Sequence, residues 1–254
     1  MTGRALTTKD HTLSSSEIEA ILASTEKSDR LPARIDLISE AFLARPYAAN
    51  PLGGGPGQPE TLTASLEAFD CVTYIETVLA LALSGISGDA AEFLDLLRRI
   101  RYEDGEVAWQ KRNHYMTGWA ENNESAGFVR NITDGPLAEK ITRTLSVVEG
   151  LPARRVTFQL FRKRKLASIS ARIETGDLIL FASAKRNLDF FHTGFLIERD
   201  GELRLRHATR SAGAVVEQPL PDFLDRFRMS GFVLLRPAGR FDPSRHSYTE
   251  GKQD

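Results

Sequence analysis

The stretch Phe69-Asp70-Cys71-Val72-Thr73-Tyr74-Ile75-Glu76-Thr77 decides the fold prediction, because it holds the only cysteine of the chain and opens a long apolar run. Apolar residues recur at helical spacing after it, which predicts a buried helix over residues 71–83. Asp70 is expected to be the N-cap, since its carboxylate can accept a hydrogen bond from a free backbone N–H. Cys71 then lies in the first turn, where the helix dipole favours the thiolate, the reactive form of cysteine.

A lone cysteine is more often a small buried hydrophobe than a catalyst. Two histidine-containing segments far downstream favour the catalytic interpretation here. They are Phe190-Phe191-His192-Thr193-Gly194-Phe195-Leu196-Ile197 and Leu203-Arg204-Leu205-Arg206-His207-Ala208. A cysteine followed much later by a histidine on a strand is the order found in papain-like thiol hydrolases.

The composition describes an ordinary globular protein. The chain has 254 residues, of which 41% are hydrophobic and 26% charged, and its formal net charge is -1. No global field therefore favours nucleic acid or an anionic membrane as a partner. A single cysteine excludes an intrachain disulfide framework and a zinc site built from several cysteines.

The ends of the chain and its domain organisation are predicted as follows. We expect a lead-in at residues 1–13, a single domain with an N-terminal helical extension at 14–239, and a tail at 240–254. No segment is apolar and long enough to span a bilayer. Residues 1–10 lack the apolar centre of a signal peptide. Two locations stay open: the cell envelope or periplasm if a signal peptide has been removed, and the cytoplasm otherwise.

The predicted elements run helices first and strands second, which indicates an α+β fold. A helix capped by Ser14, Ser15 or Ser16 is followed by helices at 32–44, 71–83 and 88–102. The helix at 32–44 is expected to face inward through Ile35, Leu37, Ile38, Ala41 and Phe42. Strands are expected at 154–160, 176–181, 190–197, 202–208, 215–216 and 232–235, with a short helix at 221–227. Asp200-Gly201 between two strands is a strong hairpin signal.

Two irregular segments flank the cysteine helix. Residues 45–60 are so rich in glycine and proline that we expect an ordered loop, anchored by Tyr47 and Leu52. Residues 109–123 contain both tryptophans together with Arg and Asn side chains. Such a mixture suits a wall that binds a sugar or a peptide, but it equally fits a surface loop pinned by two buried tryptophans. The sequence leaves these two interpretations even.

The predicted hairpin suggests a catalytic arrangement. His192 begins one strand and His207 ends its partner, so antiparallel pairing brings the two side chains together. If the helix beginning at Cys71 packs there, His192 can take the thiol proton and His207 can orient the imidazole of His192. The backbone N–H of Cys71 can stabilise an oxyanion. For a second oxyanion donor we consider Tyr47 or a side chain of residues 113–115.

Four motifs together resemble the N-acetylmuramoyl-L-alanine amidase-like branch of the NlpC-type cell-wall peptidases. They are the Phe69–Thr77 stretch, Arg112-Asn113-His114-Tyr115, Gly176-Asp177, and His192-Thr193-Gly194 followed by His207-Ala208. The resemblance covers roughly residues 47–237. It implies a papain-like fold in which a helical layer carrying the nucleophile packs on an antiparallel sheet. It also implies a Cys-His-His triad and cleavage of the amide between the lactyl group of N-acetylmuramic acid and L-alanine in peptidoglycan.

The resulting site prediction has catalytic and substrate-binding parts. The catalytic residues are Cys71, His192 and His207. The expected substrate-binding residues are Tyr47, Thr73, Trp109, Arg112, Asn113, His114, Tyr115, Trp119, Asn122 and Phe191. We expect no metal or other cofactor, a muramyl peptide as substrate, no nucleic acid, no stable membrane insertion, and a monomer.

Three alternatives stay open. An endopeptidase could cut within the stem peptide. A zinc amidase could use His114, His192 and His207, although no short His-x-x-x-His pair supports it. A non-catalytic wall-binding module is the third, and the presence of every triad residue weighs against it.

Overall fold

The structure is a computed structural model that describes residues 15–24, 28, 30–84 and 89–239. Its helices are α1 (Ser15–Ser24), α2 (Leu31–Ala41), α3 (Cys71–Leu83), α4 (Ala90–Arg101), α5 (Met116–Ser125), α6 (Leu166–Ile169) and α7 (Leu220–Arg226). Its strands are β1 (Val129–Asn131), β2 (Ala138–Leu145), β3 (Arg154–Phe161), β4 (Leu178–Ser183), β5 (Phe190–Arg199), β6 (Glu202–Thr209), β7 (Ala214–Pro219) and β8 (Met229–Pro237). The predicted lead-in, the predicted tail and a cap at Ser14 lie outside the described residues.

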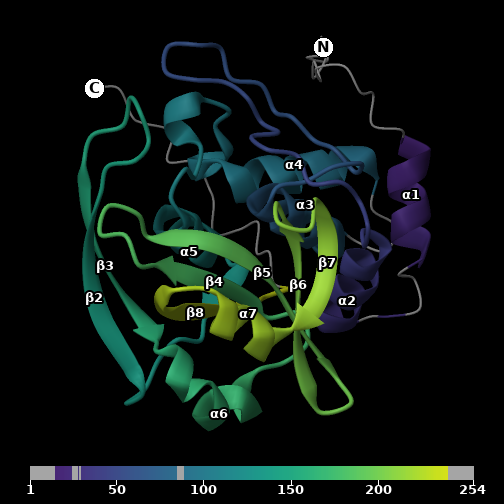
Figure 1. The fold of residues 1–254 in the computed structure, drawn as a ribbon. Helices are drawn as coiled ribbons and strands as arrows, with labels where there is room; N and C mark the ends of the chain where they lie inside the picture. Colours follow the sequence, from purple (N-terminus) through teal and green to yellow (C-terminus); the bar gives the residue numbers. More distant parts are fainter. Residues whose placement is uncertain (1–14, 25–27, 29, 85–88, 240–254) are drawn as a thin grey trace, which may run out of the picture.

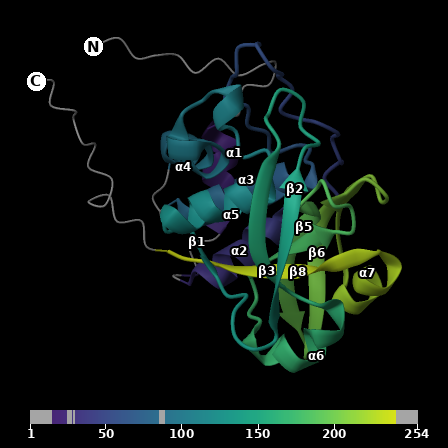
Figure 2. The ribbon, with the colours of Figure 1, turned by 90° about the vertical axis from the view of Figure 1, so that its left-hand side faces the viewer.

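Within the described ranges the strands form one eight-stranded sheet in the order β2-β3-β8-β4-β5-β6-β7, with β1 paired to β8 (Figure 1). The pairings between named strands are antiparallel. Helices α1 to α5 cover one side of the sheet and α7 lies on the other, as Figure 2 shows. The α+β prediction with an antiparallel sheet is therefore confirmed.

Helix α3 occupies the centre of the helical layer. Its bounds confirm the prediction of a helix over 71–83, and its side chains from Thr73 to Ala82 are buried. Burial on all sides follows because α3 packs against α2, α4, β5 and β6. A helix enclosed in this way needs apolar residues around its whole circumference, as this sequence provides. No helix in the described ranges is both long and apolar enough to cross a membrane.

The inner face of α2 differs from the prediction. Leu37 and Ala41 are exposed, whereas Arg34 and Ser39 are buried. The reason is that this face meets polar partners: Arg34 donates to carbonyl groups at the end of α3, and Ser39 Oγ accepts from the buried Arg206 of β6 at 2.6 Å. Helix α2 also ends earlier than predicted, at Ala41.

Four elements were not expected from the sequence: β1, β2, α5 and the short α6. Strand β2 is mostly exposed or half-buried, so apolar alternation does not mark it. It pairs with β3 along the whole of that strand. Helix α5 carries mostly polar residues and lies within the segment for which a binding wall or a pinned loop was considered. Weak hydrophobic periodicity explains why the sequence did not predict β2 and α5.

The hairpin predicted at Asp200-Gly201 is confirmed. The two residues connect β5 to β6 and have φ values of 54° and 79°. Positive φ at both central positions is the requirement of a type I′ turn, which matches the right-handed twist of the strands that it joins. This turn sets the pairing of β5 with β6, for example Phe195 opposite Arg206.

A buried ion pair joins α3 to α4. The side chains of Glu76 and Arg101 are each 2% exposed, and Arg101 Nε lies 2.7 Å from Glu76 Oε2. Arg101 also donates to the carbonyl of Thr63, and Trp119 Nε1 of α5 donates to Glu76 Oε1 at 3.2 Å. Removing one partner of such a buried pair typically costs about 3–5 kcal/mol, because a charge is left unpaired in the interior.

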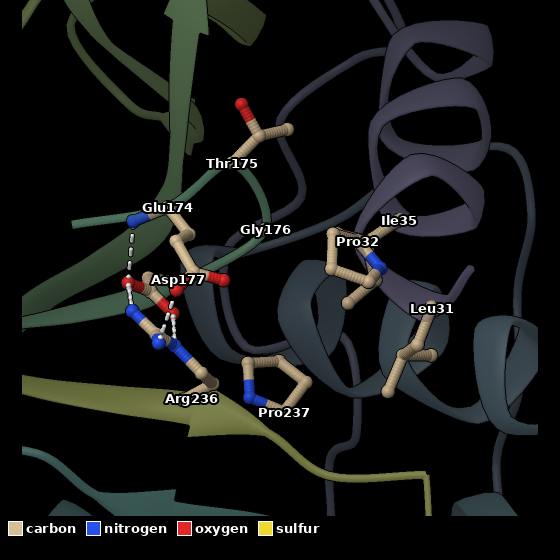
Figure 3. Close-up of a pocket in the computed structure, with 9 residues that line it drawn as sticks. All are labelled: Leu31, Pro32, Ile35, Glu174, Thr175, Gly176, Asp177, Arg236 and Pro237. Carbon is tan, nitrogen blue, oxygen red and sulfur yellow. Dashed lines mark hydrogen bonds and ion pairs between the residues drawn. The ribbon is translucent and has the colours of Figure 1, made fainter. Parts of the chain in front are cut away.

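A second ion pair joins β8 to the residue that precedes β4, close to the start of α2. Arg236 of β8 contacts Asp177 through Nε–Oδ1 at 2.8 Å and through Nη2–Oδ2 at 2.9 Å (Figure 3). Beside it lies a hollow of about 40 Å³ against Pro32. Gly176 turns the chain here with φ 91°, and a Cβ would lie 3.3 Å from the Cα of Pro32. The charges beside the hollow are paired with each other, and its volume is near that of a single water. We therefore interpret it as a packing feature between the sheet and α2 and not as a ligand site.

Candidate active site

Cys71 lies at the N-terminus of α3, where a capping box holds the first turn. Asp70 Oδ1 accepts from the backbone N–H of Val72 at 3.0 Å and of Thr73 at 2.7 Å, while Thr73 Oγ1 accepts from the N–H of Asp70 at 3.0 Å. The predicted cap at Asp70 is confirmed. A cap of this kind is worth about 1 kcal/mol. It also takes up the side chain of Thr73, which is therefore part of the helix start.

A cavity of about 420 Å³ opens over Cys71 and His192. Its lining residues are Tyr47, Cys71, Phe191, His192, Thr209, Arg210, Ser211, Phe223 and Phe227. The structure thus brings four of the predicted site residues to one place: Tyr47, Cys71, Phe191 and His192. Tyr47 reaches the cavity from the glycine-rich loop, whose first residues are tied to Phe69 and Gly213 by backbone hydrogen bonds.

The two histidines form a hydrogen-bonded pair on neighbouring strands. His192 Nε2 of β5 lies 2.5 Å from His207 Nδ1 of β6, and the rings meet edge to face with centroids 4.7 Å apart. This bond occupies Nε2 of His192, so Nδ1 is its remaining ring nitrogen, and Cys71 lines the same cavity as His192. His207 itself is 1% exposed and lies behind His192. The arrangement can perform nucleophile, base and orienter chemistry.

Gly194 explains why these imidazoles can meet. A Cβ at this position would lie 2.9 Å from the Cβ of His207 and 2.7 Å from the carbonyl oxygen of Arg206. Backbone and Cβ atoms cannot move aside as the end of a flexible side chain can. The glycine two residues after His192 therefore makes room for His207 on the same face of the sheet.

Burial keeps the groups of the site neutral. It raises the pKa of the Cys71 thiol to about 12, and the nearby Asp70 carboxylate raises it further, against the backbone N–H groups of Thr193, Cys71 and Val72. Burial lowers the pKa of His192 to about 3, with a contribution from His207, and that of His207 to about 4. Burial of Cys71 thus acts against the helix dipole, which favours the thiolate.

Most of the predicted binding residues lie elsewhere. Arg112, Asn113, His114, Tyr115 and Asn122 line a second cavity of about 580 Å³, between α5 and the loop before β3. None of them belongs to the lining of the Cys71 cavity. Several are engaged internally: Asn122 Nδ2 donates to Asn113 Oδ1 at 2.7 Å, and the Tyr115 hydroxyl accepts from the N–H of Val147 and Val148.

The two tryptophans are structural. Trp119 is 0% exposed and donates to Glu76, and Trp109 is 6% exposed beneath the glycine-rich loop. The interpretation of residues 109–123 as a segment pinned by two buried tryptophans is therefore correct for these two side chains.

His114 is also apart from the other histidines: its Nε2 contacts the Trp109 carbonyl at 2.7 Å. Among the described residues no group of three His, Cys, Asp or Glu side chains is placed to hold a metal.

The sequence did not point to Gln218, Arg210, Phe223 of α7 or Phe227, which follows that helix. The Gln218 side chain contacts His207 at 2.8 Å. Phe223 stacks on His192 with centroids 5.3 Å apart. A partial signal existed for Gln218, since the expected strand at 215–216 follows the His207 strand and pairs with it. Its extension to Pro219 is what places Gln218 beside the histidine.

Comparison with known proteins places the chain among amidase-like proteins. The model of a family described as AmiA-like, N-acetylmuramoyl-L-alanine amidase-like, matches residues 37–231. A structure of a Legionella pneumophila protein of family DUF1460 superimposes with a TM-score of 0.78 at 21% identity, covering 88% of this chain and 94% of that one. A structure named N-acetylmuramoyl-L-alanine amidase, from Bacteroides uniformis, has a TM-score of 0.73 at 26% identity, covering 82% and 99%. No curated protein matches in sequence.

The Gly194→Ala variant tests the close approach of the histidines. The added methyl group must displace His207 or the strand, so we expect a loss of about 1–3 kcal/mol in the free energy of unfolding. Alkylation of Cys71 by iodoacetamide should slow about tenfold or more, because the base loses its position. Gly55→Ala is the control, since a Cβ there meets only Gln58 at ordinary contact distance. Wild-type alkylation and stability in Gly194→Ala would contradict this account.

The ionisation of Cys71 can be measured directly, because the chain has no other thiol. Burial disfavours the charged form, so the thiolate should appear only as pH approaches about 12. Ultraviolet difference absorbance between wild type and Cys71→Ser, followed from about pH 4 upward, reports the thiolate alone. We expect no thiolate step at or below neutral pH. A step in the acidic range would instead show a preformed thiolate–imidazolium pair.

Proposed function

Because this chain belongs to the AmiA-like, N-acetylmuramoyl-L-alanine amidase-like family, we propose that it is a cysteine hydrolase of peptidoglycan or its fragments. The bond that we propose is the amide between N-acetylmuramic acid and L-alanine, in line with the name of the Bacteroides uniformis structure. The single observation that carries the cysteine mechanism is the shared cavity of Cys71 and His192, with His207 hydrogen-bonded behind the base.

The reaction begins from neutral groups. His192 Nδ1 takes the thiol proton as Cys71 Sγ attacks the amide carbon, and a C–S bond forms. The tetrahedral intermediate collapses: the C–N bond breaks, and the proton passes from His192 to the leaving amine. Water, activated by His192, then attacks the thioester and releases the carboxylic acid, which returns the thiol. Proton transfer during attack is required because the thiol pKa is about 12.

The oxyanion is assigned two donors. The capping carboxylate of Asp70 takes the N–H groups of Val72 and Thr73, so the N–H of Cys71 is the remaining donor of the first turn. Tyr47 lines the same cavity, and we propose its hydroxyl as the second donor. Burial raises the pKa of Tyr47, and nearby Cys71 and Asp70 act in the same direction, so the hydroxyl keeps its proton at neutral pH. Residues 113–115, the other source considered, line the second cavity.

The lineage and the mode of substrate binding complete the proposal. The order Cys71, His192, His207 and the packing of the cysteine helix on β5 support an NlpC-type, papain-like ancestry. Arg210 is the permanently charged side chain among the lining residues, and it suits a carboxylate of the peptide stem. Arg112, which lines the second cavity, donates to the Gly53 carbonyl of the same glycine-rich loop. We assign it to the glycan part of a longer substrate.

Digestion of defined muropeptides tests the function. Wild-type protein should release L-alanine-terminated peptide from muramyl peptides, read by mass spectrometry, while sugar-free stem peptides stay largely uncut. Cys71→Ala should abolish turnover, because no other thiol is present, and Cys71→Ser should lower it by orders of magnitude. A chelator is the control. Turnover in Cys71→Ala, or inhibition by the chelator alone, would contradict cysteine catalysis, and cleavage within the stem peptide would assign an endopeptidase.

Tyr47→Phe tests the second oxyanion donor. Loss of one preorganised donor should lower kcat by about 10²–10³-fold with little change in KM, because the interaction forms in the transition state. Tyr74→Phe is the matched control, since its hydroxyl donates to the Ser39 carbonyl at 3.1 Å and Tyr74 belongs to the lining of neither cavity. A kcat in Tyr47→Phe equal to that of wild type would remove Tyr47 from the oxyanion site.

A further inference from the structure

The hydrogen-bonded chain at the site continues one residue beyond the predicted triad. Gln218 of β7 lies beside His207 of β6, and its amide Nε2 is 2.8 Å from His207 Nε2. The other ring nitrogen of His207, Nδ1, is 2.5 Å from His192 Nε2. Gln218, His207 and His192 therefore form a single file of hydrogen bonds that ends at the nitrogen left for Cys71.

A neutral imidazole carries one N–H, so every bond in such a file must run in the same direction. If the Gln218 amide N–H donates to His207 Nε2, His207 must donate from Nδ1 to His192 Nε2. His192 then carries its own proton on Nδ1, the atom that has to accept the thiol proton. In this direction the base is blocked.

The opposite direction gives a competent base. If Gln218 presents its amide oxygen, His207 donates to it from Nε2 and accepts at Nδ1 from the Nε2–H of His192. Nδ1 of His192 is then bare. When it takes the thiol proton, the new positive charge is stabilised along the file down to the amide oxygen. The two ends of an amide have the same shape, so a half-turn about the last side-chain bond exchanges them without repacking.

We propose that Gln218 is a positioning residue that acts by turning its amide oxygen to His207, which sets the tautomers of both histidines and leaves Nδ1 of His192 able to accept the thiol proton. The proposal rests on the proposed cysteine mechanism. Among the described residues, no other hydrogen bond to the Gln218 side chain opposes the turn. The tautomer decides the rate because both histidines are neutral near pH 7.

Most charged groups around the pair are engaged elsewhere, and Arg210, which lines the cavity with His192, makes no hydrogen bond to either histidine within the described ranges. Arg206 and Glu217, which flank His207 and Gln218 on β6 and β7, pair with each other, and Arg206 also bonds Asp36 of α2. Asp70 caps α3. The charges of α7, among them Asp222, are on its exposed residues. Among the residues that the structure describes, no formal charge is therefore hydrogen-bonded to the file, and the dipole of the Gln218 amide is the group that selects its direction.

Two substitutions at Gln218 test whether this position must accept a hydrogen bond from His207: one removes the acceptor, and the other supplies an acceptor that cannot donate. Gln218→Met keeps the length of the side chain but removes the strong acceptor, and we expect kcat to fall about 10²-fold with KM little changed. Gln218→Glu accepts from His207 Nε2–H and cannot donate when ionised, so kcat should recover to within about tenfold of wild type. Gln159→Met is the control, a half-buried strand glutamine of β3. Thermal unfolding of each variant is followed in parallel.

The protons themselves can be observed on the full chain. Long-range ¹H–¹⁵N correlation spectra of histidine-labelled protein distinguish the Nε2–H from the Nδ1–H tautomer at each of the five histidines. We expect His192 and His207 both as Nε2–H in wild type and in Gln218→Glu, and loss of that single tautomer in Gln218→Met. Nδ1–H at both residues in wild type would overturn the proposal. So would Gln218→Glu as impaired as Gln218→Met while both stay folded.

The spectra do not depend on the substrate, so the two proposals fail separately. If wild type shows the Nε2–H tautomers but cleaves no muropeptide, the amidase function fails and the tautomer assignment stands. If muropeptides are cleaved by a Cys71-dependent route and Gln218→Met keeps wild-type kcat, the function stands and the role of Gln218 is refuted.

Discussion

A carboxylate buried in the middle of α3 is the constraint on which the helical layer depends. Burial raises the pKa of Glu76, and Arg101 opposes that shift by pairing with it. Because neither group is solvated, each needs the other in place, and Trp119 takes the second carboxylate oxygen. Helices α3, α4 and α5 are thereby held in one arrangement. With α3 fixed against β5, the position of its first residue, Cys71, is fixed as well.

The placement of Cys71 has a chemical consequence. A helix N-terminus facing open solvent would favour a thiolate. Here the helix begins beside aromatic side chains and the β5 backbone, and the loss of solvation dominates. Under the proposed mechanism the site rests as thiol and imidazole and develops charge only when substrate arrives. In a neutral site the position of each histidine proton matters, and on this ground we propose that Gln218 controls His192 through His207.

The sheet fixes the positions of His192 and His207 through the close approach of the β5 and β6 backbones. Pairing of β5 with β6 is set by a type I′ turn, and the missing side chain at Gly194 lets the two imidazoles meet on one face. Phe223 of α7 then stacks on His192 and narrows its choice of orientation. Each of these contacts joins residues from different elements, so His192, the proposed base, is oriented by the sheet and α7 together.

The sequence by itself determined the parts of this protein that local patterns encode: the cysteine helix and its Asp70 cap, the Asp200-Gly201 hairpin, the α+β order, and the adjacency of His192 and His207, which follows from antiparallel pairing. Only the tertiary structure decided which polar residues meet. Arg112, Asn113 and Tyr115 share a motif with strong side-chain chemistry, yet they line another cavity and serve the backbone. Gln218 has no motif and lies against His207. The physical reason is that hydrophobic period and capping act within one element, whereas hydrogen-bond partners and desolvation are set by the neighbouring elements that the fold brings together.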